Sequence, residues 1–193
     1  AKDLKLILAS PDDQAVRTLY TDMLTQWNER NAPGIARLFD RDGHVVGFDG
    51  SQLEGHRAIE SEMARIFADH QPAQYVGIVR EVRFLSETVA LLRAVAGMVP
   101  PGQTDLNPAV NAIQTLIAVK QDSIWQIALY QNTPAAFHGR PDAVKALTDE
   151  LRQHLAPNGQ RTADSFGTTS IAWWSSRMGG AGRSMPMVRC CGW

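Results

Sequence analysis

The chain has 193 residues, of which 44% are hydrophobic and 20% are charged, and its formal net charge is -1. This composition excludes collagen-like, largely disordered and strongly acidic chains, and the length suits one domain with an appendage. No run approaches the roughly 20 apolar residues that span a bilayer, and the first residues lack the apolar run of a signal peptide, so we expect a cytoplasmic protein. Because the net charge is close to zero, we expect neither a nucleic-acid partner nor a membrane partner.

The last part of the chain differs from the rest in composition. Residues 161–193 contain four arginines and one aspartate, so this segment carries +3 and the remainder carries -4. The two cysteines, Cys190 and Cys191, are adjacent there, whereas disulfide frameworks and zinc sites need spaced cysteines. We therefore expect a domain at residues 1–160 and an atypical tail at 161–193. The tail is either an extension without function or a segment that docks through Ile171, Trp173 and Trp174.

Three helices are predicted first. Ser10 and Pro11 followed by two aspartates predict a helix start, because serine caps free N–H groups and acids oppose the positive end of the helix dipole. Apolar residues at three- and four-residue spacing then continue the helix as far as Trp27. A short second helix at 35–39, a strand at 44–48 and an amphipathic third helix from about 55 to 70 follow.

Four strand-like segments come next, at residues 75–85, 88–99, 110–120 and 123–133. Ser86-Glu87 and Gln121-Asp122 are short connections, which favour antiparallel hairpins, and the long loop at 100–108 is a candidate pocket rim. A last amphipathic helix covers residues 144–155. Helices followed by a strand meander predict an α+β domain, in which a curved antiparallel sheet folds around a helix.

Several short motifs resemble those of the SnoaL-like, nuclear transport factor 2-like superfamily, and in particular its small members associated with enediyne antibiotic biosynthesis. The likeness covers roughly residues 12–156 and rests on Gly55-His56-Arg57-Ala58-Ile59, Gln131-Asn132-Thr133-Pro134 and His138-Gly139-Arg140-Pro141. The resemblance implies a cone-shaped α+β barrel of the cystatin-like type with a deep pocket, commonly dimerised through its sheet. Superfamily members include isomerases, polyketide cyclases, dehydratases and non-catalytic binding modules, so the fold alone does not determine the function.

Polar residues inside apolar strands are candidate pocket residues. Arg93, Gln114 and Gln131 alternate with apolar neighbours, and an inward orientation would require either a hydrogen-bond network or a polar ligand. The alternative is that they face solvent or a dimer interface. Trp27, Phe48, Phe67 and Trp125 are first of all core residues, and they would also suit the wall of a cavity for a hydrophobic ligand.

Three residues near the first predicted strand are candidate catalytic bases. His44 is the first choice, because its unperturbed pKa of about 6.5 needs little tuning, and Asp40 and Asp49 flank the same strand. A histidine beside a turn can instead simply bond the backbone. His56 and Glu60 have the spacing of a metal-binding pair but lack further ligands, and no phosphate-binding loop is present, so we expect neither a metal nor a cofactor.

Two functional hypotheses follow. The first is an accessory protein of polyketide- or enediyne-type secondary metabolism, which binds a hydrophobic intermediate or isomerises or cyclises it without a cofactor. The second is a non-catalytic dimerisation or scaffold module whose pocket is filled by its own side chains. A homodimer is expected under both.

Overall fold

The computed structural model describes residues 10–155. The predicted domain boundary at residue 160 and the predicted tail at 161–193 lie outside this range. The order of the elements is α1 (Pro11–Asn28), α2 (Ala32–Leu38), β1 (Phe39–Val46), β2 (Gln52–Glu54), α3 (His56–Asp69), β3 (Gln74–Ser86), β4 (Val89–Val99), a 3-10 turn (Pro108–Val110), β5 (Ala112–Gln121), β6 (Ile124–Pro134) and α4 (Pro141–Arg152). The predicted α+β class, with helices first and a helix last, is confirmed.

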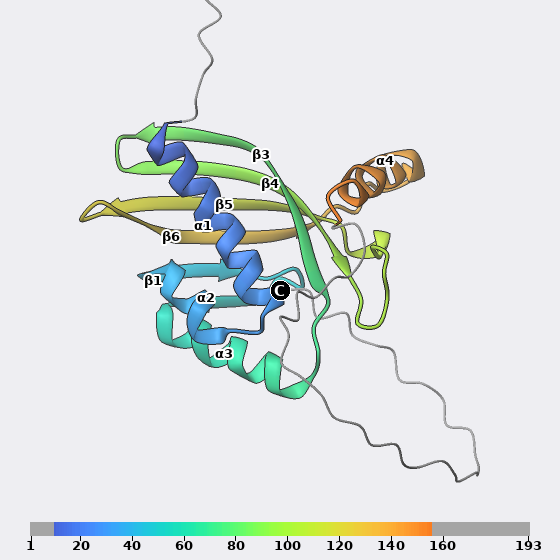
Figure 1. Ribbon diagram of the computed structural model, residues 1–193, viewed down its shortest axis with the longest axis horizontal. Helices are drawn as coiled ribbons and strands as arrows, with labels where there is room; N and C mark the ends of the chain where they lie inside the picture. Colours follow the sequence, from blue (N-terminus) through green and yellow to red (C-terminus); the bar gives the residue numbers. More distant parts are fainter. Residues whose placement is uncertain (1–9, 156–193) are drawn as a thin grey trace, which may run out of the picture. The chain divides into compact units, whose positions relative to one another are not determined.

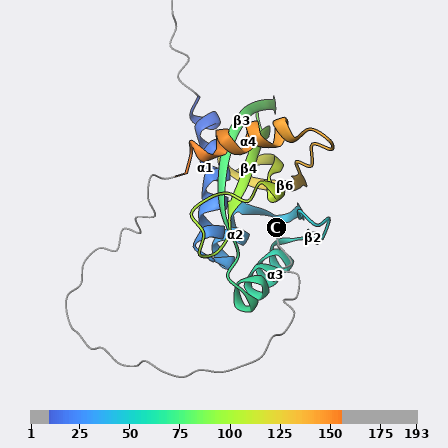
Figure 2. The ribbon, with the colours of Figure 1, turned by 90° about the vertical axis from the view of Figure 1, so that its right-hand side faces the viewer.

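Helix α1 begins as the sequence predicts. The Ser10 hydroxyl accepts a hydrogen bond from the backbone N–H of Asp13 at 3.1 Å, and Pro11 occupies the first turn. The apolar stripe is buried along the whole helix, from Val16 to Trp27. Figure 1 shows α1 lying across the sheet, and Figure 2, turned by 90°, shows it on one side of β3, β4 and β6.

The sheet has six strands in the order β2-β1-β6-β5-β4-β3. The pairs from β3 to β6 are antiparallel, as the short connections predict, but β1 runs parallel to β6. Strand β2 pairs with the end of β1, in a segment for which the sequence analysis predicts no element. The sheet is therefore mixed. Strands β1 and β6 are not joined by a hairpin, so their directions are not forced to be opposite.

The two faces of the sheet differ in what covers them. We call the face that packs on α1 the inner face; Leu92 and Leu116 lie on it and are fully buried. The opposite face, which we call the outer face, carries Arg93 and Ile113, both exposed. Successive side chains along a strand point to opposite faces, so the buried leucines and the exposed residues lie on opposite sides of the sheet.

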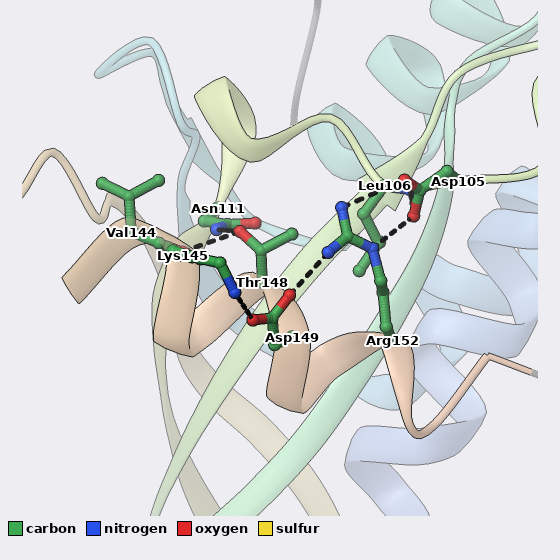
Figure 3. Close-up of polar contacts among 8 residues, drawn as sticks. All are labelled: Asp105, Leu106, Asn111, Val144, Lys145, Thr148, Asp149 and Arg152. Atoms are coloured by element: carbon green, nitrogen blue, oxygen red, sulfur yellow. Dashed lines mark hydrogen bonds and ion pairs between the residues drawn. The ribbon is translucent and has the colours of Figure 1, made fainter. Parts of the chain in front are cut away.

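Helix α4 covers one end of the outer face. Leu147 and Leu151 pack with Val95 of β4 and Leu106 of the preceding loop, in a cluster separate from the main core. Figure 3 shows the polar contacts around this cluster, in which Arg152 reaches the loop. Leu91, Ile113, Ile117 and Leu129, in the middle of the outer face, are not part of that cluster.

Candidate functional site

The inner face carries a group of buried polar side chains, which we call the inner polar cluster. It consists of Tyr20 from α1, Tyr75 from β3, Gln114 from β5, and Tyr130 and Asn132 from β6. None of the five side chains is more than 5% exposed. A buried polar group without a partner costs about 1–3 kcal/mol, so the contacts within the cluster decide what it can do.

Four members of the inner polar cluster are joined to one another by hydrogen bonds. The Tyr20 hydroxyl donates to Gln114 Oε1 at 2.7 Å, and Gln114 Nε2 donates to Asn132 Oδ1 at 3.1 Å. Asn132 Nδ2 then donates to the Tyr75 hydroxyl at 2.9 Å. The chain of bonds joins helix α1 to three strands of the sheet.

Burial raises the pKa of all three phenols in the cluster. It is the largest cause for Tyr20, Tyr75 and Tyr130, and for Tyr75 the hydrogen bonds with Asn132 and Tyr130 oppose it in part. The phenols therefore stay protonated at neutral pH. In this state a phenol can donate a hydrogen bond, as Tyr20 does, and supplies no base.

Aromatic rings pack beside this cluster. The rings of Trp27 and Phe67 lie 5.3 Å apart at an interplanar angle of 72°, and the Tyr75 ring lies 5.5 Å from Trp27. Trp27 Nε1 donates to the backbone oxygen of Ala73 at 2.9 Å, so its polar edge is also satisfied. Phe48 is partly buried against the same core.

Two of the candidate bases lie beside neighbours from their own part of the chain, and neither is enclosed. The His44 side chain is 52% exposed, and its Nε2 lies 3.7 Å from Glu54 Oε1 on the paired strand β2. Asp49 is exposed and accepts from the backbone N–H of Ser51 at 2.9 Å. Hydrogen bonds from the Ser51 hydroxyl and backbone lower the pKa of Asp49, in that order.

Asp40 lies at the irregular start of β1. It is half-buried, and its Oδ1 accepts from the backbone N–H of Arg41 at 2.6 Å. The three candidate bases thus lie on one strand and the turn after it, and no described hydrogen bond joins any of them to the inner polar cluster.

Of the three polar candidates on the strands, Gln114 alone faces inward. Arg93 lies on the outer face, 58% exposed, and pairs with Glu81 at 3.3 Å. Gln131 is exposed on the same face. The inward orientation considered for these two residues is therefore wrong. For Gln131 the physical reason is a bulge: the pairing of β6 with β5 skips Ala128, so the alternation that holds for Trp125 and Ile127 reverses before residue 131.

The four aromatic candidates do not surround one space. Trp125 packs at the start of α1, where its Nε1 donates to Asp12 Oδ1 at 2.8 Å, and Trp27 lies at the end of the same helix. Asp12 and Trp27 are about 22 Å apart along the helix axis, at 1.5 Å per residue. Lys120 also donates to Asp12 at 2.8 Å, and this contact is the first cause of the lowered pKa of Asp12.

An open groove of about 740 Å³ lies beside Asp12, and it is lined by Ser10, Phe84, Thr88 and Lys120 among others. Within residues 10–155, no group of three or more histidine, cysteine or acidic side chains is placed to hold a metal ion. Over the same range, no helix combines the length and the apolar character needed to cross a bilayer.

The sequence analysis missed four of the five cluster members as site residues. Tyr20 lies within the apolar stripe that the spacing predicts for α1 but is not named as a candidate, and Asn132 is named only as part of a motif. The alternation of side chains along β5 is a usable signal for Gln114. Ala112, Gln114 and Leu116 alternate with less buried residues and share the inner face. For Tyr130 and Asn132 the bulge at Ala128 hides that signal.

Comparison with solved structures identifies the fold. A domain of unknown function with a cystatin-like fold from Nostoc punctiforme is 25% identical, with a TM-score of 0.63 over 76% of this chain and 93% of that one. A ketosteroid isomerase-like protein from Erwinia carotovora atroseptica is 16% identical, with a TM-score of 0.51 over 63% and 95%. A candidate calcium/calmodulin-dependent protein kinase II association domain from Xanthomonas campestris is 17% identical, with a TM-score of 0.52 over 63% and 86%.

These likenesses assign the chain to the cystatin-like, nuclear transport factor 2-like fold. Neither a protein-family model nor a curated protein sequence matches it. The fold is shared by proteins named for isomerisation and for association, so the choice between these activities depends on the residues of this chain.

Proposed function

We propose that this protein is a non-catalytic homodimerisation or scaffold module. The observation that carries the proposal is the inner polar cluster, in which Gln114 and Asn132 already bond protein partners. A ligand in this position would have to break these bonds and replace each of them, because buried polar groups left without partners are costly. The aromatic contacts of Trp27 add to the filling of the interior.

The outer face supports the same proposal. Ile113 is 37% exposed, and Leu91, Ile117 and Leu129 are half-buried, although all four lie in the middle strands of the sheet. Partly exposed apolar side chains gathered on one sheet face are typical of an interaction surface. The described range has a structural neighbour named as an association domain, which favours assembly as the role of this fold here.

Sedimentation velocity on the full chain over a wide range of concentrations tests this proposal. We expect a dimer, and we expect Ile117→Asp to shift it to the monomer, because a carboxylate on the outer face would be buried without a partner. Ile124→Asp is the matched control, since Ile124 is 64% exposed next to the β5–β6 turn and should leave the dimer intact. A wild-type chain that stays monomeric at all concentrations contradicts the proposal.

A second proposal is that the protein binds, isomerises or cyclises a hydrophobic intermediate of polyketide- or enediyne-type metabolism without a cofactor. The observation that favours it is the same buried cluster, because its phenols and amides are suitable donors to a ligand oxygen. In this case Gln114 orients the ligand, Phe48 and Phe67 belong to the apolar wall, and His44, Asp40 or Asp49 is the base.

Calorimetric titration with a panel of polycyclic and polyene compounds separates the two proposals. The second one requires saturable binding, with a negative heat-capacity change from apolar burial. Phe48→Ala should weaken that binding, whereas Phe84→Ala should not, because Phe84 is exposed and packs near Trp125 at the other end of the sheet. Absence of binding across the panel contradicts the second proposal and leaves the dimerisation module.

A further inference from the structure

The middle of the outer face carries two rows of side chains that run across the strands. The first row is apolar: Leu91 pairs with Ile117, and Ile117 pairs with Leu129. The second row is polar: Arg93 pairs with Thr115, and Thr115 pairs with Gln131. Both rows are centred on β5, and they are separated by two residues, or roughly 6.6 Å, along the strands.

This pattern restricts how a second copy can pack on the face. A symmetric dimer places the same patch on both partners, related by a twofold axis in the plane of the contact. An axis that runs across the strands, between the two rows, places the apolar row of one copy against the polar row of the other. An axis along the polar row sets Arg93 on Arg93 of the partner subunit, and like charges in contact cost binding energy.

An axis parallel to β5 avoids both conflicts. It sets the apolar row on the apolar row with its order reversed, so that Leu91 meets Leu129 of the partner subunit. It also sets Arg93 opposite Gln131 of the partner subunit, where a guanidinium can donate to an amide oxygen. Sheets that pack face to face keep their strands within about 30° of each other, and a long arginine side chain tolerates that offset.

Contacts within residues 10–155 leave these groups available. Over this range Arg93 makes one hydrogen bond, to Glu81 Oε2 at 3.3 Å, and a guanidinium has five N–H donors. In the described part of the chain, Gln131 makes one long hydrogen bond from Nε2, to Thr133 at 3.5 Å, and its Oε1 accepts none. We infer that a second copy of this chain packs on the outer face about a twofold axis parallel to β5, with Arg93 of each copy against Gln131 of the other. This inference rests on the proposed dimer and adds its geometry.

Two opposite charge changes at Gln131 test the inference. Gln131→Glu places a carboxylate against the partner's Arg93 and should lower the dimer dissociation constant, whereas Gln131→Lys places two cations together and should raise it. Two symmetric contacts of this kind change the constant by about 2- to 30-fold in each direction. Sedimentation velocity at low ionic strength measures both, and added salt should reduce both effects.

Matched variants separate the proposed contact from general charge effects. Gln52→Glu and Gln52→Lys make the same charge changes on the exposed edge strand β2, and they should leave the constant unchanged. In an Arg93→Gln background, Gln131→Glu should no longer tighten the dimer. The proposed axis is wrong if both Gln131 variants shift the dimer dissociation constant in the same direction, or if neither shifts it. If Ile117→Asp still breaks the dimer in that case, the dimer through the outer face of the sheet stands. A monomeric wild-type chain overturns both.

Discussion

Gln114 illustrates how one side chain can decide between a filled core and a ligand site. Its amide group bonds Tyr20 of α1 on one side and Asn132 of β6 on the other, and it is fully buried. A glutamine in this position is stable because both of its polar atoms have protein partners.

Gln114→Leu should therefore destabilise the protein strongly. The substitution keeps the approximate size of the side chain but leaves the Tyr20 hydroxyl and Asn132 Oδ1 without Gln114, at about 1–3 kcal/mol for each buried group. Urea unfolding measures the change. Gln121→Leu, at the exposed end of the same strand, is the control and should stay within about 0.5 kcal/mol of the wild type. An equally small effect of Gln114→Leu would show that the cluster adds no stability.

For single residues, the sequence predicts the orientation of some side chains and not of others. Strict alternation along β5 places Gln114 on the same face as Ala112 and Leu116, and that face is the buried one. The orientation of Gln131 does not follow, because alternation assumes a regular strand and the bulge at Ala128 breaks it. For Arg93 the alternation with Leu91 is right, but a period of two does not say which face of a sheet packs on the helix.

Charged contacts surround the small apolar centre beneath helix α4. Arg152 donates to both oxygens of Asp105, at 2.7 and 3.0 Å, and Arg80 of β3 pairs with Glu150. Figure 3 shows the first of these contacts beside the bond from Asn111 to Thr148, which measures 2.8 Å. The hydrogen bond from Arg152 is the first cause of the lowered pKa of Asp105, and that from Arg80 is the first cause for Glu150.

These shifts predict a loss of stability in acid. In the unfolded chain the two carboxyls titrate near pH 3.9 and 4.3, above their values in the folded protein. The unfolded state therefore binds more protons in acid, so the stability that the pairs contribute is present above about pH 4.3 and is lost as the pH falls through the lowered values. Unfolding by urea at several pH values measures this loss.

Arg152→Gln should flatten part of that acid dependence, because it removes the cation that lowers the pKa of Asp105 and one of those beside Asp149. Arg57→Gln is the control: Arg57 is exposed at the start of α3 and has no ion pair within residues 10–155. If Arg152→Gln and Arg57→Gln give the same pH profile, the Arg152 contacts do not hold α4 on the sheet.

The elements themselves are largely predictable from the sequence, since apolar periodicity and turn residues agree along most of the chain. The start of α1 and the hairpins at Ser86 and Asp122 are found where the pattern predicts them. The last helix is also present, but α4 covers Pro141–Arg152 and not the predicted residues 144–155. Strand β2 is three residues long, which is too short for a periodicity to appear. The parallel pairing of β1 with β6 joins segments about 80 residues apart, and no local signal encodes it.

For the molecule as a whole, the inner and outer faces of the sheet point to different roles. The inner face is occupied by side chains that pack against one another and are linked by hydrogen bonds through Gln114 and Asn132, whereas the outer face presents partly exposed Ile113, Ile117 and Leu129 in a regular pattern. We propose that the outer face carries the function and that the inner face maintains the fold. The fold alone is compatible with either role, and the distinction comes from the contacts of this chain.

Native mass spectrometry of the full chain, incubated with the panel of polycyclic and polyene compounds, tests this account most directly, because it reports subunit number and bound mass together. We predict a species of twice the chain mass, 21.2 kDa per chain, with nothing added by any compound. A monomer at all concentrations, or a species that retains one compound per chain, would contradict the account and direct attention to the inner polar cluster as a ligand site.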